Sequence, residues 1–114
     1  MADLIPTTFT GLPILGRSMK VTVDLPRSPG LDALRVIVEP LLYGGRLEHV
    51  SVLHDGKPTD MFVGEDSAYA GNVRNDKATA IYRANWINQH PKDDPESLPA
   101  IYGPAVLVDR RVWF

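Results

Sequence analysis

Residues 72–90 read NVRNDKATAIYRANWINQH, and this segment predicts the helix around which the rest of the fold is organised. Asn75 is a favoured N-cap residue, because its side chain can accept a hydrogen bond from a free amide of the first turn. Asp76 follows at a position where the helix dipole favours a negative charge. Pro91 lies just past the other end of the segment. The sequence therefore predicts a helix that begins after Asn75 and ends before Pro91.

This predicted helix carries two apolar stripes at helical spacing. The first stripe consists of Ala78, Ala80, Ile81, Ala84 and Ile87, and the second consists of Tyr82 and Trp86. We therefore expect the helix to pack on two sides, with Ile81 in the core.

Upstream of the helix, Asp55-Gly56 separates two segments of alternating pattern, residues 46–54 and 57–63. This dipeptide favours a two-residue type I′ turn, since both central residues then have positive φ. Such a turn pairs His54 with Lys57, Leu53 with Pro58, Val52 with Thr59, Ser51 with Asp60, Val50 with Met61, His49 with Phe62 and Glu48 with Val63. Val50, Val52, Met61 and Val63 then share one face, which we expect to be buried under the helices.

The remaining segments complete an α+β pattern. Met19–Leu25 alternates as a half-buried strand, and Ile101–Val108 is apolar enough for a second one. Between them, Ser28-Pro29 predicts the start of a helix that Gly44-Gly45 stops. Its apolar stripe is Leu31, Leu34, Val38, Leu41 and Leu42, and Pro40 predicts a kink or an early end near Glu39.

The proline and glycine residues near the N-terminus predict an arm over residues 1–17, with short peripheral strands. A loop is expected over residues 64–71. Residues 18–114 then form a single α+β domain with the order strand, helix, strand, strand, helix, strand. This order suggests a small sandwich with both helices on one face of the sheet, of which a ferredoxin-like arrangement is one form.

Composition restricts the classes of function. The chain has 114 residues, no cysteine and a formal net charge of −2. The absence of cysteine excludes a disulfide framework and cysteine-based metal sites. The acidic balance and scattered bases disfavour nucleic-acid binding without excluding it. No segment has the pattern of a signal peptide or the apolar length of a membrane span, so we expect a cytoplasmic protein without a membrane partner.

Three motifs resemble an uncharacterised family of small proteins found in phages, plasmids and their bacterial hosts, which is known only as a domain of unknown function. They are the acidic Val63-Gly64-Glu65-Asp66, the helix opening Asn75-x-x-Ala78-Thr79, and Ile101-Tyr102-Gly103-Pro104-Ala105 before the last strand. The resemblance covers residues 18–108. It implies an accessory role in a mobile element and assigns no catalytic residue.

No catalytic or metal-binding constellation can be assembled from the sequence, so we expect a protein that is not an enzyme and carries no cofactor. His49 and His54 are five residues apart, which puts them on opposite faces of a regular strand. His49, Ser51 and Asp60 share a face, but Ser51 lies between the other two, whereas a catalytic histidine must bridge serine and carboxylate.

Two segments are candidate binding surfaces. On the hairpin face opposite Val52, His49 pairs with Phe62, and Leu53 and Pro58 extend an apolar patch that either the chain itself or a partner must cover. The C-terminal segment contains Arg110, Arg111, Trp113 and Phe114, which suit either a partner interface or a tail folded back onto the domain.

The first hypothesis is therefore a non-enzymatic accessory protein that binds a host or phage protein, with homodimerisation through the hairpin patch as a variant. The second is a nucleic-acid-binding module that uses an open sheet face. That reading needs stacking aromatic residues on neighbouring central strands. Phe62 would serve, but the first strand offers only Lys20, Thr22 and Asp24 outward, so half of the platform is missing.

Overall fold

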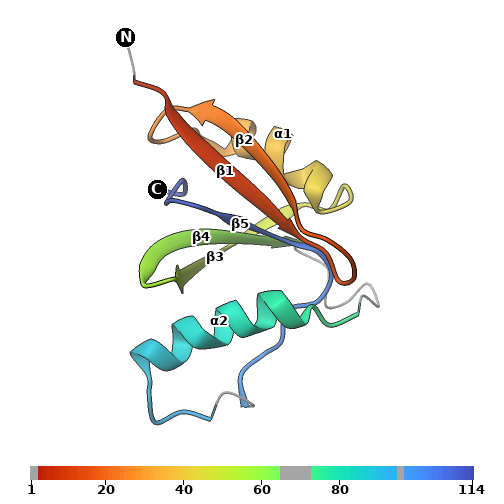
Figure 1. Ribbon diagram of the computed structural model, residues 1–114, viewed down its shortest axis with the longest axis vertical. Coiled ribbons are helices and arrows are strands. Elements are labelled where there is room, and N and C mark those ends of the chain that lie inside the picture. The colour runs from red at the N-terminus through yellow and green to blue at the C-terminus, as the bar shows by residue number, and fades with distance from the viewer. Residues whose placement is uncertain (1–2, 65–72, 95–96) are drawn as a thin grey trace.

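The computed structural model describes residues 3–64, 73–94 and 97–114 (Figure 1). In chain order, the elements are β1 (Ile5–Leu12), β2 (Met19–Leu25), α1 (Leu31–Leu41), β3 (Leu47–His54), β4 (Lys57–Gly64), α2 (Asp76–Gln89) and β5 (Ala105–Val108). The α+β class is confirmed, as is the order of strands and helices from residue 18 onward. The loop expected over residues 64–71 lies, apart from Gly64, outside the described residues, as do Glu65 and Asp66 of the acidic motif.

The five strands form one antiparallel sheet in the order β2-β1-β5-β4-β3. The expectation of a peripheral arm over residues 1–17 is wrong, because β1 lies inside the sheet between β2 and β5. Phe9 of β1 is fully buried and pairs with Val108. Pro6 is tolerated near the start of β1, where β5 does not extend beside it.

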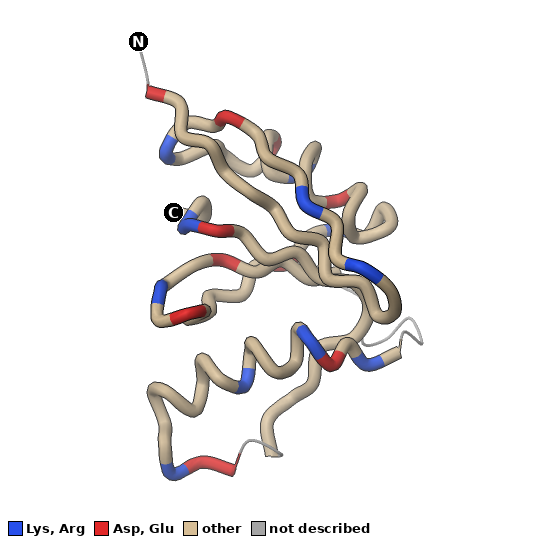
Figure 2. Tube along the Cα trace, viewed as in Figure 1, with Lys and Arg blue, Asp and Glu red and all other residues tan. Residues whose placement is uncertain are grey.

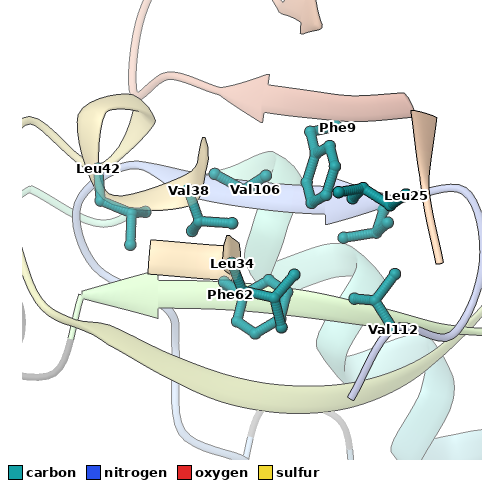
Figure 3. Close-up of a cluster of buried hydrophobic side chains, with 9 residues drawn as sticks. Phe9, Leu25, Leu34, Val38, Leu42, Phe62, Val106 and Val112 are labelled. Atoms are coloured by element: carbon teal, nitrogen blue, oxygen red, sulfur yellow. The ribbon is translucent and has the colours of Figure 1, made fainter. Parts of the chain in front are cut away.

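The two helices cover opposite faces of the sheet, which corrects the expectation that both lie on one face. On the α1 side, the core contains Phe9, Leu25, Leu34, Val38, Leu42, Phe62, Val106, Val108 and Val112 (Figure 3). On the α2 side, the core contains Leu12, Val52, Met61, Val63, Ala78 and Ala105. Successive strand residues point to opposite faces, and β4 is apolar on both, since Met61 and Phe62 are each buried. One helix layer could not have covered both faces.

The hairpin register is confirmed at every predicted pair, from Glu48 with Val63 to His54 with Lys57. Asp55 and Gly56 have φ values of 53° and 73°, as a type I′ turn requires. Val52, Met61 and Val63 are buried under α2, as expected.

Helix α1 differs from its prediction at both ends. It begins after Gly30, whose φ of 88° favours glycine, rather than at Ser28-Pro29. It continues through Pro40 to Leu41 instead of ending near Glu39. The stripe is buried at Leu34, Val38 and Leu42, while Leu31 is exposed.

The N-cap of α2 is confirmed, because the Asn75 side chain accepts a hydrogen bond from the amide of Ala78 at 3.1 Å. Its amide group also donates to the carbonyls of Leu12 and Gly103, at 2.8 and 2.9 Å. Asn75 therefore joins the end of β1, the segment before β5 and the start of α2.

The predicted stripes of α2 are only partly correct. Ala78 is buried, and Ile81 and Tyr82 pack against the same core. Ala80 and Ala84 are exposed, however, and the buried positions include Thr79 and Arg83 instead. These two polar side chains donate to the carbonyls of Ile101 and Leu98. The segment before β5 therefore covers a side of α2 that the apolar pattern does not mark.

Candidate functional site

The C-terminal tail, which we define as residues 110–114, covers the predicted hairpin patch at His49 and Phe62. Asp60 is fully buried and accepts hydrogen bonds from the backbone amides of Val112 and Trp113, at 2.7 and 2.9 Å. Its other oxygen lies 2.7 Å from Nε2 of His49. Charge-assisted hydrogen bonds of this kind are stronger than neutral ones. Of the two alternatives for this segment, the structure has the tail folded back onto the domain.

Phe62 is therefore core and not part of a free patch. Its ring lies beneath the edge of the Trp113 indole, with ring centroids 6.0 Å apart, and it packs in the α1 core. Of the two alternatives for the hairpin patch, cover by the chain itself is found at this residue, because α1 and the tail bury it, so Phe62 is not a binding residue. Leu53 is half-buried and Pro58 is exposed.

Arg110 holds the tail in place. Its Nε donates to the Thr7 hydroxyl at 2.9 Å, and its two terminal nitrogens donate to the carbonyls of Arg27 and Pro26, at 3.0 and 2.9 Å. The planar guanidinium suits such a set of divergent acceptors. Arg111 and Phe114 are exposed, and the Arg27 guanidinium lies 5.9 Å from the centre of the Phe114 ring.

Of the group His49, Ser51 and Asp60, the first and the last contribute to this same attachment. The imidazole of His49 contacts Asp60 through Nε2 and stacks on Trp113 through its face. Asp60 uses its second oxygen for the tail amides. Ser51 is paired with Asp60 in the strand ladder, as expected, and is exposed. His54 lies apart from His49, at the hairpin turn beside Asp55.

A cleft of 420 Å³ lies on the half of the sheet that α2 leaves open. Its lining residues are Thr8, Thr10, Lys20, His54, Asp55, Lys57, Thr59, Leu107, Val108 and Asp109. Two lysines are balanced by two aspartates, and His54 is the single aromatic side chain among these lining residues, so neighbouring strands offer no second ring for stacking. Lysine and arginine residues alternate with acidic ones over the described chain instead of gathering on one segment (Figure 2). The stacking platform required by the nucleic-acid hypothesis is therefore not found on this face.

A second, more apolar pocket of 170 Å³ lies where the β1–β2 connection meets the end of α1. Its lining residues are Gly11, Leu12, Pro13, Arg17, Met19, Pro40, Leu41 and Tyr43. Met19 and Tyr43 line the pocket and are 62% and 75% exposed. Leu15, in the connection between the lining residues Pro13 and Arg17, is 87% exposed. We call Leu15, Met19 and Tyr43 the apolar end of the molecule.

Turns expose two of these three residues, and the packing of α1 beside the β1–β2 connection brings their segments to one pocket. Pro13 and Gly16, the latter with a φ of 95°, shape a connection that carries Leu15 outward beyond β1 and β2. Tyr43 follows α1 and has a φ of 56°, so the chain turns sharply as the helix ends. The sequence analysis missed this surface because its residues belong to three separate segments, and the only signal was an apolar residue beside each turn.

No family model, curated protein or solved structure matches this chain. The resemblance to the phage and plasmid family stays a prediction. Neither of the helices in the described part of the chain has the length and apolarity needed to cross a membrane.

Proposed function

We propose that this chain is a non-enzymatic protein-binding module and that its binding surface is the apolar end. The observation that carries the proposal is the exposure of Met19 and Tyr43 in the lining of an apolar pocket, with the exposed Leu15 in the connection between the lining residues Pro13 and Arg17. Large apolar side chains that gather at a pocket mark interaction surfaces, whereas single exposed ones need no explanation.

The chemistry of the pocket defines the kind of partner. Apolar residues form most of its walls, and Arg17 is an exposed cation among its lining residues. A partner that inserts an apolar side chain and places a carboxylate beside it would satisfy both features. Tyr43 supplies a large contact area at a small cost in side-chain entropy.

This proposal moves the binding surface away from the hairpin. His49, Phe62, Arg110 and Trp113 act in the core and the tail attachment, so they stabilise the fold on which the apolar end is built. The accessory role in a phage or mobile element is implied by the resemblance alone and stays a prediction.

Affinity capture from a lysate of the native cells tests the proposal. The bait proteins are the wild type, the double variant Leu15→Ser/Tyr43→Asn and the control Val36→Ser. Asparagine tolerates the positive φ at position 43, and Val36 is an exposed apolar residue that does not line the pocket. We expect the wild type and the control to retain the same protein after nuclease treatment, and the double variant to lose it.

Retention of the same protein by all three baits would contradict the proposal. Capture that disappears on nuclease treatment would favour the nucleic-acid hypothesis instead.

A further inference from the structure

Strand β2 forms an open edge of the sheet. It pairs with β1 without interruption from Met19 opposite Gly11 to Leu25 opposite Ile5, and no strand formed by the described residues lies on its other side. Natural proteins usually protect such edges with prolines, bulges, charged side chains or a covering element, because unpaired backbone groups are a template for a further strand. Of these devices, β2 carries the charged residues Lys20 and Asp24. Within β2 there is no proline, and the pairing with β1 contains no bulge.

The other edge strand of the sheet, β3, has a helix beside it. Helix α2 packs against β3, and the side chain of Asn85 donates a hydrogen bond to the carbonyl of Ser51 at 3.2 Å. Figure 1 shows α2 beside β3, at the opposite end of the sheet from β2. The chain thus protects one edge and leaves the other available.

The sequence of β2, MKVTVDL, is self-complementary in an antiparallel pairing centred on Thr22. In that register, Lys20 of each copy lies opposite Asp24 of the other. Val21 lies opposite Val23, and Met19 lies opposite Leu25. Opposite charges and apolar residues in directly facing positions both stabilise antiparallel strands.

The pairing would also keep the apolar side chains of both copies on one face of the joined sheet and the polar ones on the other. Met19, Val21, Val23 and Leu25 point to the α1 side of the sheet, as Val21 does opposite the buried Phe9. Lys20, Thr22 and Asp24 are exposed on the other side. A shift of the register by one residue would place apolar residues opposite charged ones. A shift by two would keep the faces but would place Lys20 or Asp24 opposite Thr22, so only the register centred on Thr22 pairs the opposite charges.

We propose that the protein forms a two-fold symmetric dimer in which the β2 strands of two copies pair antiparallel about Thr22. The two five-stranded sheets then become one continuous sheet. This dimer goes beyond the proposed function. The apolar ends of the two copies lie at opposite ends of the shared strand pair, and Leu15 and Tyr43 of each copy lie outside that pair. An isologous contact of this kind closes on itself and does not propagate into a fibre.

Charge exchange provides a sharp test, because Lys20 and Asp24 lie opposite the uncharged residues Thr10 and Pro6 in the ladder with β1. Lys20→Glu places like charges opposite each other at both symmetric pairs, and Asp24→Lys does the same with the opposite sign. Each single variant should dimerise roughly tenfold more weakly than the wild type in sedimentation equilibrium at low ionic strength. The double variant Lys20→Glu/Asp24→Lys should recover the wild-type association.

Mixing the two single variants adds a second readout. A heterodimer of Lys20→Glu with Asp24→Lys has opposite charges at both pairs, so the mixture should associate more strongly than either variant alone. Matching unfolding temperatures would show that all variants are folded.

A wild type that is monomeric at every concentration overturns the dimer, as does a dimer whose affinity none of these changes alters. Either result leaves the proposed function standing if Leu15→Ser/Tyr43→Asn still abolishes capture. Conversely, a charge-dependent dimer with unchanged capture by that variant would overturn the proposed function alone.

Discussion

The indole of Trp113 lies stacked on the imidazole of His49, with ring centroids 5.0 Å apart and ring planes 7° apart. This contact joins the C-terminal tail to the hairpin and covers the predicted patch at His49 and Phe62, while Pro58 stays exposed. The buried carboxylate of Asp60 holds both partners, through His49 and the amides of the tail. The tail is thus a structural part of the domain.

Removal of residues 112–114 should destabilise the protein by about 3–5 kcal/mol. The deletion exposes the α1 core at buried Val112 and leaves Asp60 without two of its donors. Urea denaturation measures the effect. Removal of Phe114 alone is the control and should cost less than about 0.5 kcal/mol, because this residue is exposed. Equal stability of the wild type and the longer deletion would show that the tail is not attached as described.

Asn75→Ala should cost about 2–4 kcal/mol, since it removes a helix cap and two buried hydrogen bonds to the carbonyls of Leu12 and Gly103. Asn75→Asp is the informative comparison. It retains an acceptor for the amide of Ala78 but places carboxylate oxygen near the two carbonyls. We expect Asn75→Asp to be no more stable than Asn75→Ala. A near-native unfolding free energy for Asn75→Asp would mean that only the cap matters.

Val52→Asp should cost several kcal/mol, because Val52 is buried under α2 in an apolar cluster that offers no partner for a carboxylate. The matched control is Val36→Asp, the same substitution at an exposed position of α1. Thermal unfolding of the two variants separates burial from helix or strand propensity. Similar unfolding temperatures would contradict the hairpin register.

Local patterns predicted much of the fold. The hairpin register follows from Asp55-Gly56 and a period of two, and the start of α2 follows from Asn75. Both depend on residues close in sequence, and both are confirmed.

The features that were missed depend on long-range contacts. An apolar residue at position 62 suits both an exposed binding patch and a core, and only the position of α1 decides that Phe62 is core. Strand β1 becomes internal through pairing with β5, nearly a whole chain length away. In α2, Arg83 is buried because Leu98 supplies a carbonyl, which no helical periodicity reveals.

The apolar end was missed for the same reason, since Leu15, Met19 and Tyr43 come together only once α1 is placed.

Ile81 is half-buried instead of fully buried. The loss of unfolding free energy in Ile81→Ala should therefore lie at or below the lower end of the usual range for such changes, at about 1–2 kcal/mol.

The central claim is that the apolar end binds a protein partner, and its most direct test is a titration of the captured partner, once purified, against three proteins. We expect the wild type and Val36→Ser to bind with equal affinity, and Leu15→Ser/Tyr43→Asn to bind at least about 30-fold more weakly, as the loss of two anchor residues implies. Equal affinity for all three proteins would contradict the claim.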